Sequence, residues 1–297
     1  MKIIAAVVTH NRANLLDRCI SGIIAQTRHP DEILVVNNGS TDNTLDILSK
    51  YNVKIINQEN SGSAGGWYSA IKYSLENDFD YIWLMDDDGC PNKDALSLLE
   101  SNYRPEFACL SSVVVNENNP NQFVFPFPSI RKNGIPDTFR FWIKFRLLNS
   151  LPLDYGLYYP YAHLFNGALI NLEAVKKIGN VNKDYFMYGD EVDYYFRLKK
   201  FGDVKSLLTA VHYHPDVLKR KYSIQRIYYN LKNNIINYYK HHDLPFIRSL
   251  VAPLIILSRV SKTNGFLFMI SLLIGKNAPA FYKGFFRGLG KKIGKDF

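Results

Sequence analysis

The sequence predicts an α/β protein built on a mainly parallel sheet with helices on both faces. Over about the first hundred residues, apolar runs of strand length alternate with segments of helical periodicity. The apolar runs are continuous, which is typical of strands covered on both faces, and polar clusters follow them. The 297 residues suffice for one such domain and a smaller appendage, which we expect at residues 1–240 and 241–297.

The first part of the chain alternates most clearly. Continuous apolar runs predict strands at residues 3–9, 33–36, 53–56 and 81–85, and helical spacing predicts helices at 13–26, 41–50, 64–77 and 93–102. Ser40 or Thr41 is expected to cap the helix at 41–50. In such sheets ligands bind beyond the carboxyl ends of the strands, so the residues that follow each strand are candidates for a site.

The second part is less regular. Residues 115–160 lack clear periodicity and are rich in Asn, Pro, Phe and Tyr. This predicts an irregular excursion that either covers a substrate or is only a surface insertion. Strand and helix patterns return at 167–178, 191–200 and 204–211, and a helix is expected from 223 to about 240.

Residues 241–297 differ in character from the rest. Their apolar segments, 250–257 and 266–274, are shorter than the ~20 residues that a membrane-spanning helix needs. Lys, Arg and Phe residues follow, a combination typical of a segment that lies in a membrane interface. The alternative is a helical pair that packs on the first domain with a solvated basic face. The formal net charge of +9 favours an anionic partner. The basic residues cluster towards the C-terminus beside apolar segments, which favours a membrane over nucleic acid as that partner.

Two features indicate the compartment. The three cysteines have no CxxC spacing, which fits a reducing environment better than a disulfide framework. The apolar run at residues 1–8 is too short for a signal peptide and is expected to be a strand. We therefore expect a cytoplasmic protein, peripheral on the inner face of the cell membrane.

Three adjacent carboxylates, Asp86, Asp87 and Asp88, follow the strand at 81–85. Like charges this close are tolerated where a hard cation neutralises them, and oxygen ligands suit Mg²⁺ or Mn²⁺. Alternation along an extended segment would put Asp86 and Asp88 on one side and Asp87 on the other, so Asp86 and Asp88 are candidates to share one ion. The alternative is a solvated acidic turn before Gly89.

Two further clusters follow the strands at 33–36 and 53–56. The first, residues 37–42, has the sequence NNGSTD; its amides match a pyrimidine edge, although a plain Asn-Gly turn has the same composition. The second, residues 57–66, is glycine-rich and precedes a helix, so its backbone N–H groups can approach a diphosphate. It is neither a Walker A loop nor a GxGxxG motif, and alone it would be only a glycine-rich turn.

Acidic and imidazole groups occur later in the chain. Asp190 and Glu191 stand at a predicted helix start, where negative charge is favoured in any case, and Asp193 and Arg197 are spaced to form an ion pair on that helix. A strand at 204–211 leads into the sequence VHYHP, at 211–215. One of its two histidines either completes a metal shell with the aspartates or is an ordinary structural histidine.

In order and spacing, these motifs resemble family 2 glycosyltransferases of the GT-A fold over about residues 1–240. Five segments carry the resemblance: VTHNR at 8–12 (the first strand end), NNGSTD at 37–42 (the nucleotide-binding turn), the aspartates at 86–88 (the DxD element), FNGA at 165–168 (the acceptor-side segment) and the acidic pair at 190–191 (the base). Within the family, the triple Asp and YYNLKN at 228–233 are most similar to bacterial galactofuranosyl- and rhamnosyltransferases.

The resemblance implies an activity and a cofactor. The activity is the inverting transfer of a sugar, with galactofuranose or rhamnose favoured, from a nucleotide-diphosphate donor to a glycan or lipid-linked oligosaccharide in cell-surface polysaccharide synthesis. The cofactor is Mn²⁺ or Mg²⁺ on Asp86, Asp88 and His214, because the spacing from Arg197 and Gly202 places His214, rather than His212, at the family's metal position.

The resemblance also implies roles for individual residues. Glu191 is the expected base, and Asp190 is the alternative because the family's usual base is an Asp. The expected donor contacts come from Thr9, Asn11, Arg12, Asn37, Asn38, Ser40, Asn60, Gly65, Gly66, Asp86 and Asp87. The expected acceptor contacts come from Phe165, Asn166, Gly167 and Asp193.

Two other classes of protein fit parts of the pattern. A nucleotidyltransferase of sugar phosphates also uses a carboxylate-bound metal on an α/β sheet, but generally carries a Gly-rich signature with Lys or Arg near its N-terminus. Here the first strand ends in Thr-His-Asn-Arg, without glycine. A non-catalytic basic membrane-binding protein is suggested only by the charge of +9; it would need no metal and would bind with steep salt dependence.

Overall fold

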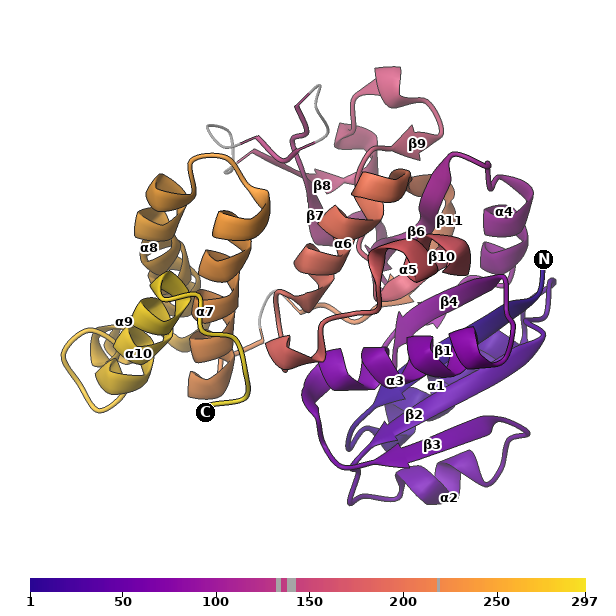
Figure 1. Cartoon of the computed structure of the whole chain (residues 1–297), viewed down its shortest axis with the longest axis horizontal. Coiled ribbons are helices and arrows are strands. Elements are labelled where there is room, and N and C mark those ends of the chain that lie inside the picture. Colours follow the sequence, from indigo (N-terminus) through magenta and orange to yellow (C-terminus); the bar gives the residue numbers. More distant parts are fainter. Residues whose placement is uncertain (132–134, 138–142, 218–219) are drawn as a thin grey trace.

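The computed structural model describes residues 1–131, 135–137, 143–217 and 220–297. Figure 1 shows a central sheet covered by helices on both faces, with a separate group of C-terminal helices beside it. The α/β class predicted from the sequence is confirmed.

The N-terminal half of the sheet is parallel. It consists, in spatial order, of β3 (Lys54–Gln58), β2 (Glu32–Asn38), β1 (Ile3–Thr9) and β4 (Tyr81–Asp86). All seven residues of β1 are buried, which explains its continuous apolar run. The register pairs Thr9 with Asn37 and Val8 with Asp86, so the carboxyl ends of β1, β2 and β4 meet at one edge of the sheet.

The other half of the sheet is mixed. β10 (Asn166–Asn171) runs antiparallel between β4 and β6 (Phe107–Asn116), β11 (Asp203–His214) is parallel to β6, and the short β5 (Cys90–Pro91) pairs with β11. Because β10 is reversed, its first residue, Asn166, lies opposite Met85 near the end of β4. β11 runs in the same direction as β4, so its last residue, His214, reaches the same edge.

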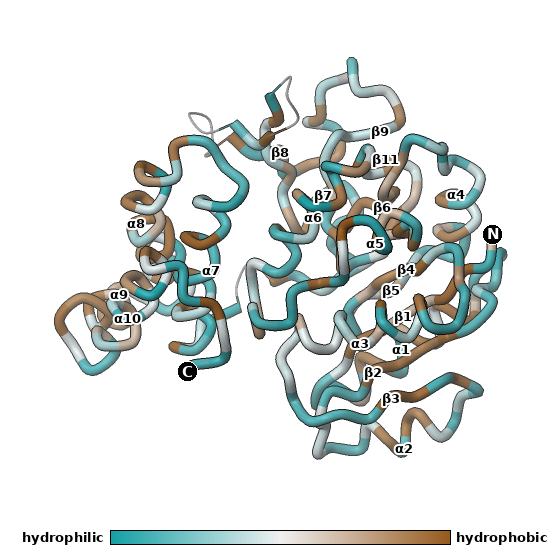
Figure 2. The backbone as a smooth tube through the Cα atoms, viewed as in Figure 1, coloured by the Kyte–Doolittle hydropathy of each residue, from teal (hydrophilic) through white to brown (hydrophobic). Residues whose placement is uncertain are grey.

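Helices cover both faces of this sheet. α1 (Ala13–Ile24) and α4 (Ala95–Ser101) pack on one face, and α3 (Gly62–Glu76), α5 (Leu172–Ile178) and α6 (Asp190–Phe201) pack on the other. Figure 2 shows hydrophobic segments along the strands between these layers. The predicted helices are present, with ends that differ by a few residues.

The second helix differs most from its prediction. α2 (Thr44–Leu48) is shorter than the expected 41–50, and neither Ser40 nor Thr41 caps it. Asp42 is the residue that organises its start, because Asp42 Oδ1 accepts a hydrogen bond from Thr44 N at 3.1 Å. The expected cap was wrong because this aspartate forms a tight turn with the backbone two residues ahead.

Residues 115–160 contain strands where an irregular excursion was expected. β6 is followed by β7 (Asn119–Pro128), which pairs with β6 and with β8 (Lys144–Leu147), while β9 (Tyr158–Tyr159) pairs with β11. Aromatic side chains, among them Phe123 and Phe127, form a core beneath these strands. The prediction failed because prolines interrupt the pattern of β7, whose pairing with both neighbours shifts register, and Pro is tolerated at such irregularities.

Four helices form the C-terminal group: α7 (Ile224–His241), α8 (Pro245–Asn264), α9 (Phe266–Ser271) and α10 (Ala278–Leu289). They share a core that includes Ile235 of α7, Val260 of α8 and Phe281 of α10. α7 begins as predicted, with Ser223 Oγ accepting a hydrogen bond from Arg226 N at 3.2 Å. Across the described parts of the chain, no helix combines the length and the apolar character needed to cross a bilayer.

Candidate active site

The three aspartates lie in a turn and not in an extended segment. β4 ends at Asp86, and Gly89 N donates to the Asp86 carbonyl at 3.3 Å, so the chain turns over Asp87 and Asp88. The expected alternation of these side chains is therefore wrong. Arg12 Nη1 lies 2.8 Å from both Asp87 Oδ1 and Asp88 Oδ2, which places those two carboxylates on the same side.

The chain itself neutralises part of this negative charge. Thr9 Oγ1 donates to Asp87 Oδ2 at 2.8 Å. Burial raises the pKa of Asp87, and the charge of Arg12 opposes that rise. Burial, followed by the charges of Asp88 and Asp87, raises the pKa of Asp86 well above its ordinary value. The guanidinium of Arg12 therefore neutralises part of the negative charge for which the sequence predicted a metal ion. Of the three carboxylates, Asp86 is the one whose charge Arg12 offsets least.

His214 lies next to the aspartates, as the sequence predicted. Its Nε2 is 3.0 Å from Asp88 Oδ1, and its Nδ1 donates to the Pro215 carbonyl at 2.7 Å. A carbonyl can only accept, so Nδ1 carries a proton; contact with a backbone carbonyl commonly orients metal-binding histidines, and here it turns Nε2 towards Asp88. Burial would raise the pKa of Asp88, but the contact with His214 and the charge of Arg12 lower it.

His212 has a different environment. It is fully buried, and neither ring nitrogen has a hydrogen-bond partner among the described residues. Burial, with a smaller effect from His214, lowers its pKa to about 3, so the ring is neutral. A Cβ atom at Gly89 would lie 1.9 Å from His212 Nε2, so the ring fills the space beneath the aspartate turn. The geometry agrees with the choice of His214 as the residue at the site.

Two of the three predicted metal ligands, Asp88 and His214, lie next to each other. The 3.0 Å between Asp88 Oδ1 and His214 Nε2 matches two adjacent ligands that each lie about 2.1 Å from an octahedral ion. Within the described residues, no three His, Cys, Asp or Glu side chains are grouped so that they could hold a metal, so Asp86 does not complete the set. Asp88 and His214 are therefore the two predicted ligands that the structure brings together, and they are not joined by a third among the described residues.

A cavity of about 410 Å³ opens beside Asp88. Arg12, Arg220 and residues 215–217 line it. Arg220 makes no side-chain hydrogen bond or ion pair with the residues that the structure describes, and burial, followed by the charges of Arg226 and Arg12, lowers its pKa. Sequence reasoning missed Arg220, because nothing in its local sequence distinguishes it from other basic residues. Arginines around an acidic group are suited to a diphosphate with a bound cation.

The amides at the end of β2 are engaged within the protein. Asn37 Nδ2 donates to Asn57 Oδ1 at 2.9 Å, and Asn38 Nδ2 donates to the Gly62 carbonyl at 2.9 Å. Asn38 Oδ1 accepts from Ser61 N at 3.1 Å. Both asparagines are buried, so they tie the strand-end loops together and do not offer their amides to a base.

The other predicted donor residues of this edge border the site from the surface. Asn11 N donates to Ser40 Oγ at 3.0 Å, and Asn11 Oδ1 accepts from Thr41 N at 2.6 Å. Asn60 Oδ1 accepts from Gly62 N at 3.0 Å. Asn11 and Asn60 are exposed, so they remain accessible while they hold neighbouring loops together.

Gly65 and Gly66 lie inside α3 and not in an open loop. A Cβ atom at Gly66 would lie 2.4 Å from Val8 Cγ1, and one at Gly65 would lie 2.1 Å from Ser61 Oγ. Both glycines are buried. The structure therefore gives them a packing role, since the missing Cβ at Gly66 lets α3 approach β1, in place of the expected contact with a diphosphate.

The predicted acceptor-side segment lies directly beside the aspartates. The Phe165 carbonyl accepts from Asp86 N at 2.8 Å, and the Phe165 ring stacks on Trp67 with centroids 4.6 Å apart. Asn166 is buried, and its Oδ1 has no partner among the described residues. Gly167 has a φ of +87°, which favours glycine. These residues therefore lie beside the end of β4, next to the aspartates.

Asp190 and Glu191 begin α6, and Glu191 contacts the chain just before Phe165. Glu191 Oε1 accepts from Leu164 N at 2.8 Å and lies 3.6 Å from His163 Nδ1, and its side chain is 35% exposed. Burial and the charges of Asp88 and Asp87 are the main causes of the raised pKa of Asp86, and the charge of Glu191 raises it further. The carboxylates of Glu191 and Asp86 therefore face one region. Asp190 is buried, and burial followed by the charge of Glu191 raises its pKa to about 7. Glu191 is thus the accessible carboxylate of the pair.

Asp193, expected to contact the acceptor, faces α7. Its carboxylate accepts from Arg197 Nε at 2.9 Å, as the spacing predicted, and lies 2.9 Å from His241 Nε2. Burial would raise the pKa of Asp193, but His241, Arg197 and Lys240 lower it. The side chain is buried and its partners come from α6 and α7, so it holds these helices together.

Asn233 on α7 holds the loop that precedes the acidic pair. Its Nδ2 lies 3.0, 2.9 and 2.9 Å from the carbonyl oxygens of Tyr185, Met187 and Tyr188. Phe186 and Tyr188 have φ values of +63° and +59°, a region that bulky residues rarely adopt. The amide of Asn233 therefore stabilises a strained turn that sets the position of Asp190 and Glu191.

Comparisons with known proteins give the class. The family model described as Glycosyl transferase family 2 matches residues 5–163. The galactofuranosyltransferase GlfT1 of Mycolicibacterium smegmatis is 31% identical over 222 residues, which cover 71% of this chain and 70% of that protein. GlfT1 of Mycobacterium tuberculosis is 30% identical over 226 residues, with 72% and 70% covered.

Two solved structures share the fold. A mannosyltransferase from Pyrobaculum calidifontis, in complex with GDP-Man and Mn²⁺, matches with a TM-score of 0.57 at 16% identity, covering 98% of this chain and 84% of that chain. TarS of S. aureus, in complex with UDP-GlcNAc, matches with a TM-score of 0.54 at 17% identity, covering 97% and 81%.

The sheet, the aspartate turn at its carboxyl edge and the structural matches define a glycosyltransferase of the GT-A fold. The chain belongs to glycosyl transferase family 2. Galactofuranosyltransferases are among its relatives, over about 70% of their length.

Proposed function

We propose that this glycosyltransferase is a metal-dependent, inverting enzyme that moves galactofuranose or rhamnose from a nucleotide-diphosphate donor to a glycan or lipid-linked oligosaccharide in cell-surface polysaccharide synthesis. One observation carries the proposal: Asp88 and His214 lie 3.0 Å apart, and the charge of Glu191 is among those that raise the pKa of Asp86, after burial and the neighbouring aspartates, so the aspartate turn and Glu191 border one region. This arrangement would bring a carboxylate that can act as a base close to the groups that bind the leaving diphosphate.

The donor diphosphate would occupy the cavity beside Asp88, where Arg12 and Arg220 provide positive charge. A divalent ion, Mn²⁺ or Mg²⁺, would be held by Asp88 and His214 and would neutralise charge on the departing diphosphate. Mn²⁺ in the complex of the similar mannosyltransferase supports the choice of metal.

Glu191 would act as the base. One of its oxygens accepts from Leu164 N, which orients the carboxylate and leaves the other oxygen to take the proton of the acceptor hydroxyl. The hydroxyl oxygen then forms a bond to the anomeric carbon while the bond from that carbon to the diphosphate oxygen breaks on the opposite face, so the configuration inverts. Asp190, with its pKa raised to about 7 chiefly by burial, is the second candidate.

The choice of sugar rests on sequence similarity. The galactofuranosyltransferases that match this chain are 30–31% identical to it over about 70% of its length. The structurally similar proteins were solved with GDP-Man and UDP-GlcNAc, which supports a nucleotide sugar as donor but not a particular sugar.

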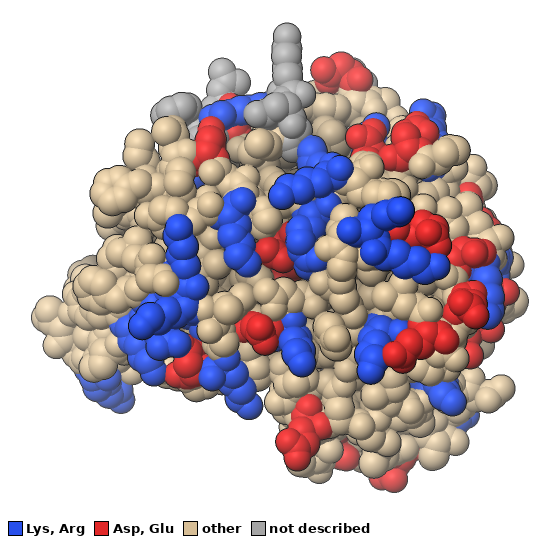
Figure 3. Space-filling view, in the orientation of Figure 1, with Lys and Arg blue, Asp and Glu red and all other residues tan. Residues whose placement is uncertain are grey.

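The C-terminal helices would rest on the inner face of the cell membrane. They carry a set of large apolar side chains that are more than half exposed: Phe246, Leu254, Phe266, Leu267, Ile274 and Phe286. Figure 3 shows Lys and Arg side chains gathered at the same end of the molecule, around α10. A surface that is both apolar and basic binds an anionic bilayer without spanning it.

A donor screen tests the proposed reaction. The full chain is incubated with Mn²⁺ and, in turn, UDP-galactofuranose, dTDP-rhamnose, UDP-GlcNAc and GDP-mannose, and nucleotide release is measured. We expect one of the first two donors to be turned over fastest, EDTA to abolish release, and added Mn²⁺ or Mg²⁺ to restore it. Release that persists in EDTA would contradict the metal, and equal release from all four donors would contradict the choice of sugar.

A further inference from the structure

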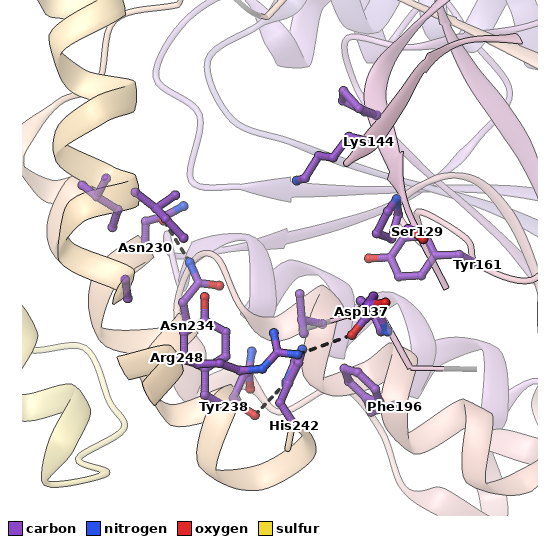
Figure 4. Close-up of a pocket in the computed structure, with 18 of the residues that line it drawn as sticks. Ser129, Asp137, Lys144, Tyr161, Phe196, Asn230, Asn234, Tyr238, His242 and Arg248 are labelled. Atoms are coloured by element: carbon purple, nitrogen blue, oxygen red, sulfur yellow. Dashed lines mark hydrogen bonds between the residues drawn. The ribbon is translucent and has the colours of Figure 1, made fainter. Parts of the chain in front are cut away.

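A second cavity, of about 260 Å³, lies between the helical group and the strands β7 and β8. Figure 4 shows it framed by Lys144 of β8, Asn230 and Asn234 of α7, and Arg248 of α8, and Arg259 of α8 also lines it. Its volume is just below the ~300–1,000 Å³ typical of sites for drug-sized ligands, which suits a small polar group better than a whole oligosaccharide.

The cavity carries uncompensated positive charge. Lys144 and Arg259 form no ion pair with any residue that the structure describes. The third cation, Arg248, is paired with Asp243 at 3.0 Å, and the acidic lining residue, Asp137, lies 3.4 Å from Arg131. Lys144 and Arg259 are therefore the two cations of the lining that have no ion-pair partner among the described residues.

The cavity adjoins the proposed base. His163 lines it, and His163 Nδ1 lies 3.6 Å from Glu191 Oε1. The cavity beside Asp88, lined by Arg12 and Arg220, shares no residue with it. A group bound near Lys144 is therefore on the side of the acceptor and not on the side of the donor.

We propose that this cavity is a subsite for the phosphate or diphosphate group of a phosphorylated acceptor, held by Lys144 and Arg259 so that the acceptor's sugar reaches Glu191 past His163. The proposal rests on the transferase function proposed above and specifies its acceptor. The guanidinium of Arg259 can bind two phosphate oxygens at once, Lys144 adds a point charge, and the amides of Asn230 and Asn234 supply further polar contacts. The acceptor is either a lipid phosphate or a free sugar phosphate, which share this chemistry.

Calorimetric titration with inorganic pyrophosphate tests the subsite on the full chain. EDTA is present, so that the metal-dependent donor site does not respond. We expect saturable binding that becomes at least about tenfold weaker in Lys144→Gln and in Arg259→Gln, because each loses a charge-assisted contact. Lys262→Gln is the matched control, since Lys262 lies on the same helix outside the cavity. Arg220→Gln, on the donor side, should also bind normally.

Two results would overturn the subsite: no pyrophosphate binding by the wild type, or binding that is lost in Arg220→Gln and kept in Lys144→Gln and Arg259→Gln. Lys144 and Arg259 are exposed, so the variants are expected to fold, and unchanged thermal unfolding confirms it.

Two further arms identify the source of the phosphate. Flotation with phosphatidylcholine vesicles that contain undecaprenyl phosphate, compared with vesicles that lack it, supports a lipid phosphate if Lys144→Gln removes the difference. Titration with glucose 1-phosphate supports a free sugar phosphate if the same variant weakens binding. Responses to both ligands that are identical in wild type and variant would contradict the subsite.

Donor turnover separates this proposal from the one on which it rests. Nucleotide release in the absence of acceptor should be equal in wild type, Lys144→Gln and Arg259→Gln if the subsite belongs to the acceptor, and a loss of this release in both variants would contradict that assignment. If the wild type turns over none of the nucleotide sugars, the transferase proposal fails, whereas the pyrophosphate titration still decides whether the subsite exists.

Discussion

At the scale of single residues, Asp190 and Glu191 are neighbours in sequence with different surroundings. Glu191 is partly exposed and oriented by Leu164 N, whereas Asp190 is buried beneath it. A carboxylate that must take a proton from a substrate has to be reachable, so the geometry favours Glu191.

Replacing Glu191 with Gln is expected to reduce kcat by ~10²–10⁴, because general-base catalysis typically contributes that much. The amide keeps the shape of the side chain but cannot accept the proton. Nucleotide release in the presence of acceptor measures the effect. Glu173→Gln, at an exposed position of α5, is the matched control. Near-normal turnover in Glu191→Gln would transfer the role to Asp190.

Asp190 makes stability depend on pH. Its pKa is raised from 3.8 to about 7, first by burial and then by the charge of Glu191, so between those values the folded state keeps a proton that the unfolded state has released. The free energy of unfolding therefore falls as pH rises through this window. Asp190→Asn cannot ionise, so its melting temperature relative to wild type should increase from about pH 4 to about pH 8.

Thermal unfolding of the wild type and of Asp190→Asn from about pH 4 to about pH 8 measures the difference in melting temperature. Most other groups titrate equally in both proteins, so their effects cancel in this difference. A constant difference in melting temperature would show that Asp190 titrates in the folded protein as it does in the unfolded chain.

At the scale of the elements, α7 supports the site although it provides no reacting group. Asn233 binds the backbone of the turn before α6, and the ion pairs of Asp193 join α6 to α7. Asn233 is the last residue of the YYNLKN segment at 228–233, which resembles galactofuranosyl- and rhamnosyltransferases, and its contacts explain why an asparagine stands there.

Asn233→Ala should lower the free energy of unfolding by about 1–3 kcal/mol, because buried carbonyl groups lose their donor. It should also lower kcat, since the turn sets the position of Glu191. Asn234→Ala is the control for stability. Asn234 is only partly buried and donates to Asn230 Oδ1 within the same helix, so its loss should cost about 0.5 kcal/mol or less. Equal destabilisation by the two changes would contradict the special role of Asn233.

At the scale of the whole molecule, the C-terminal helices combine a buried core with an exposed apolar surface. Leu267 and Ile274 are 84% and 85% exposed. Contact with a bilayer would remove this surface from water, and the basic residues nearby would add attraction to anionic lipid.

Leu267→Glu should weaken binding to vesicles containing anionic lipid by about tenfold or more, because one buried Leu contributes roughly 1.5–3 kcal/mol. Co-sedimentation at fixed salt measures the change. Leu45→Glu, which replaces a half-exposed Leu on α2, should bind as the wild type does. Equal binding by both variants, or none by the wild type, would exclude this surface.

Much of the fold could be predicted locally. β1, β2 and β4 are covered on both faces, so each is a continuous apolar run visible in sequence. β6 was missed although its ten buried residues form a comparable run. The strands after it were missed because prolines and asparagines interrupt their pattern. The reversed direction of β10 has no local signal.

The candidate site was predictable in outline. The pairing of Asp88 with His214 was expected and is present. The turn over Asp87, the two contacts of Arg12 and the packing role of Gly66 were not expected, because each depends on a partner from a distant part of the chain. Arg220 and His163 were missed for the same reason.

The sequence by itself determined the class of protein and the edge of the sheet where its chemistry lies, because polar residues after parallel strands come together at one edge whatever the loops do. Only the tertiary structure decided which of those side chains face ligands and which bind one another. Burial, charge and hydrogen-bond partners are properties of the packed chain, and they separate Glu191 from Asp190, His214 from His212 and Arg12 from the other arginines that the structure describes.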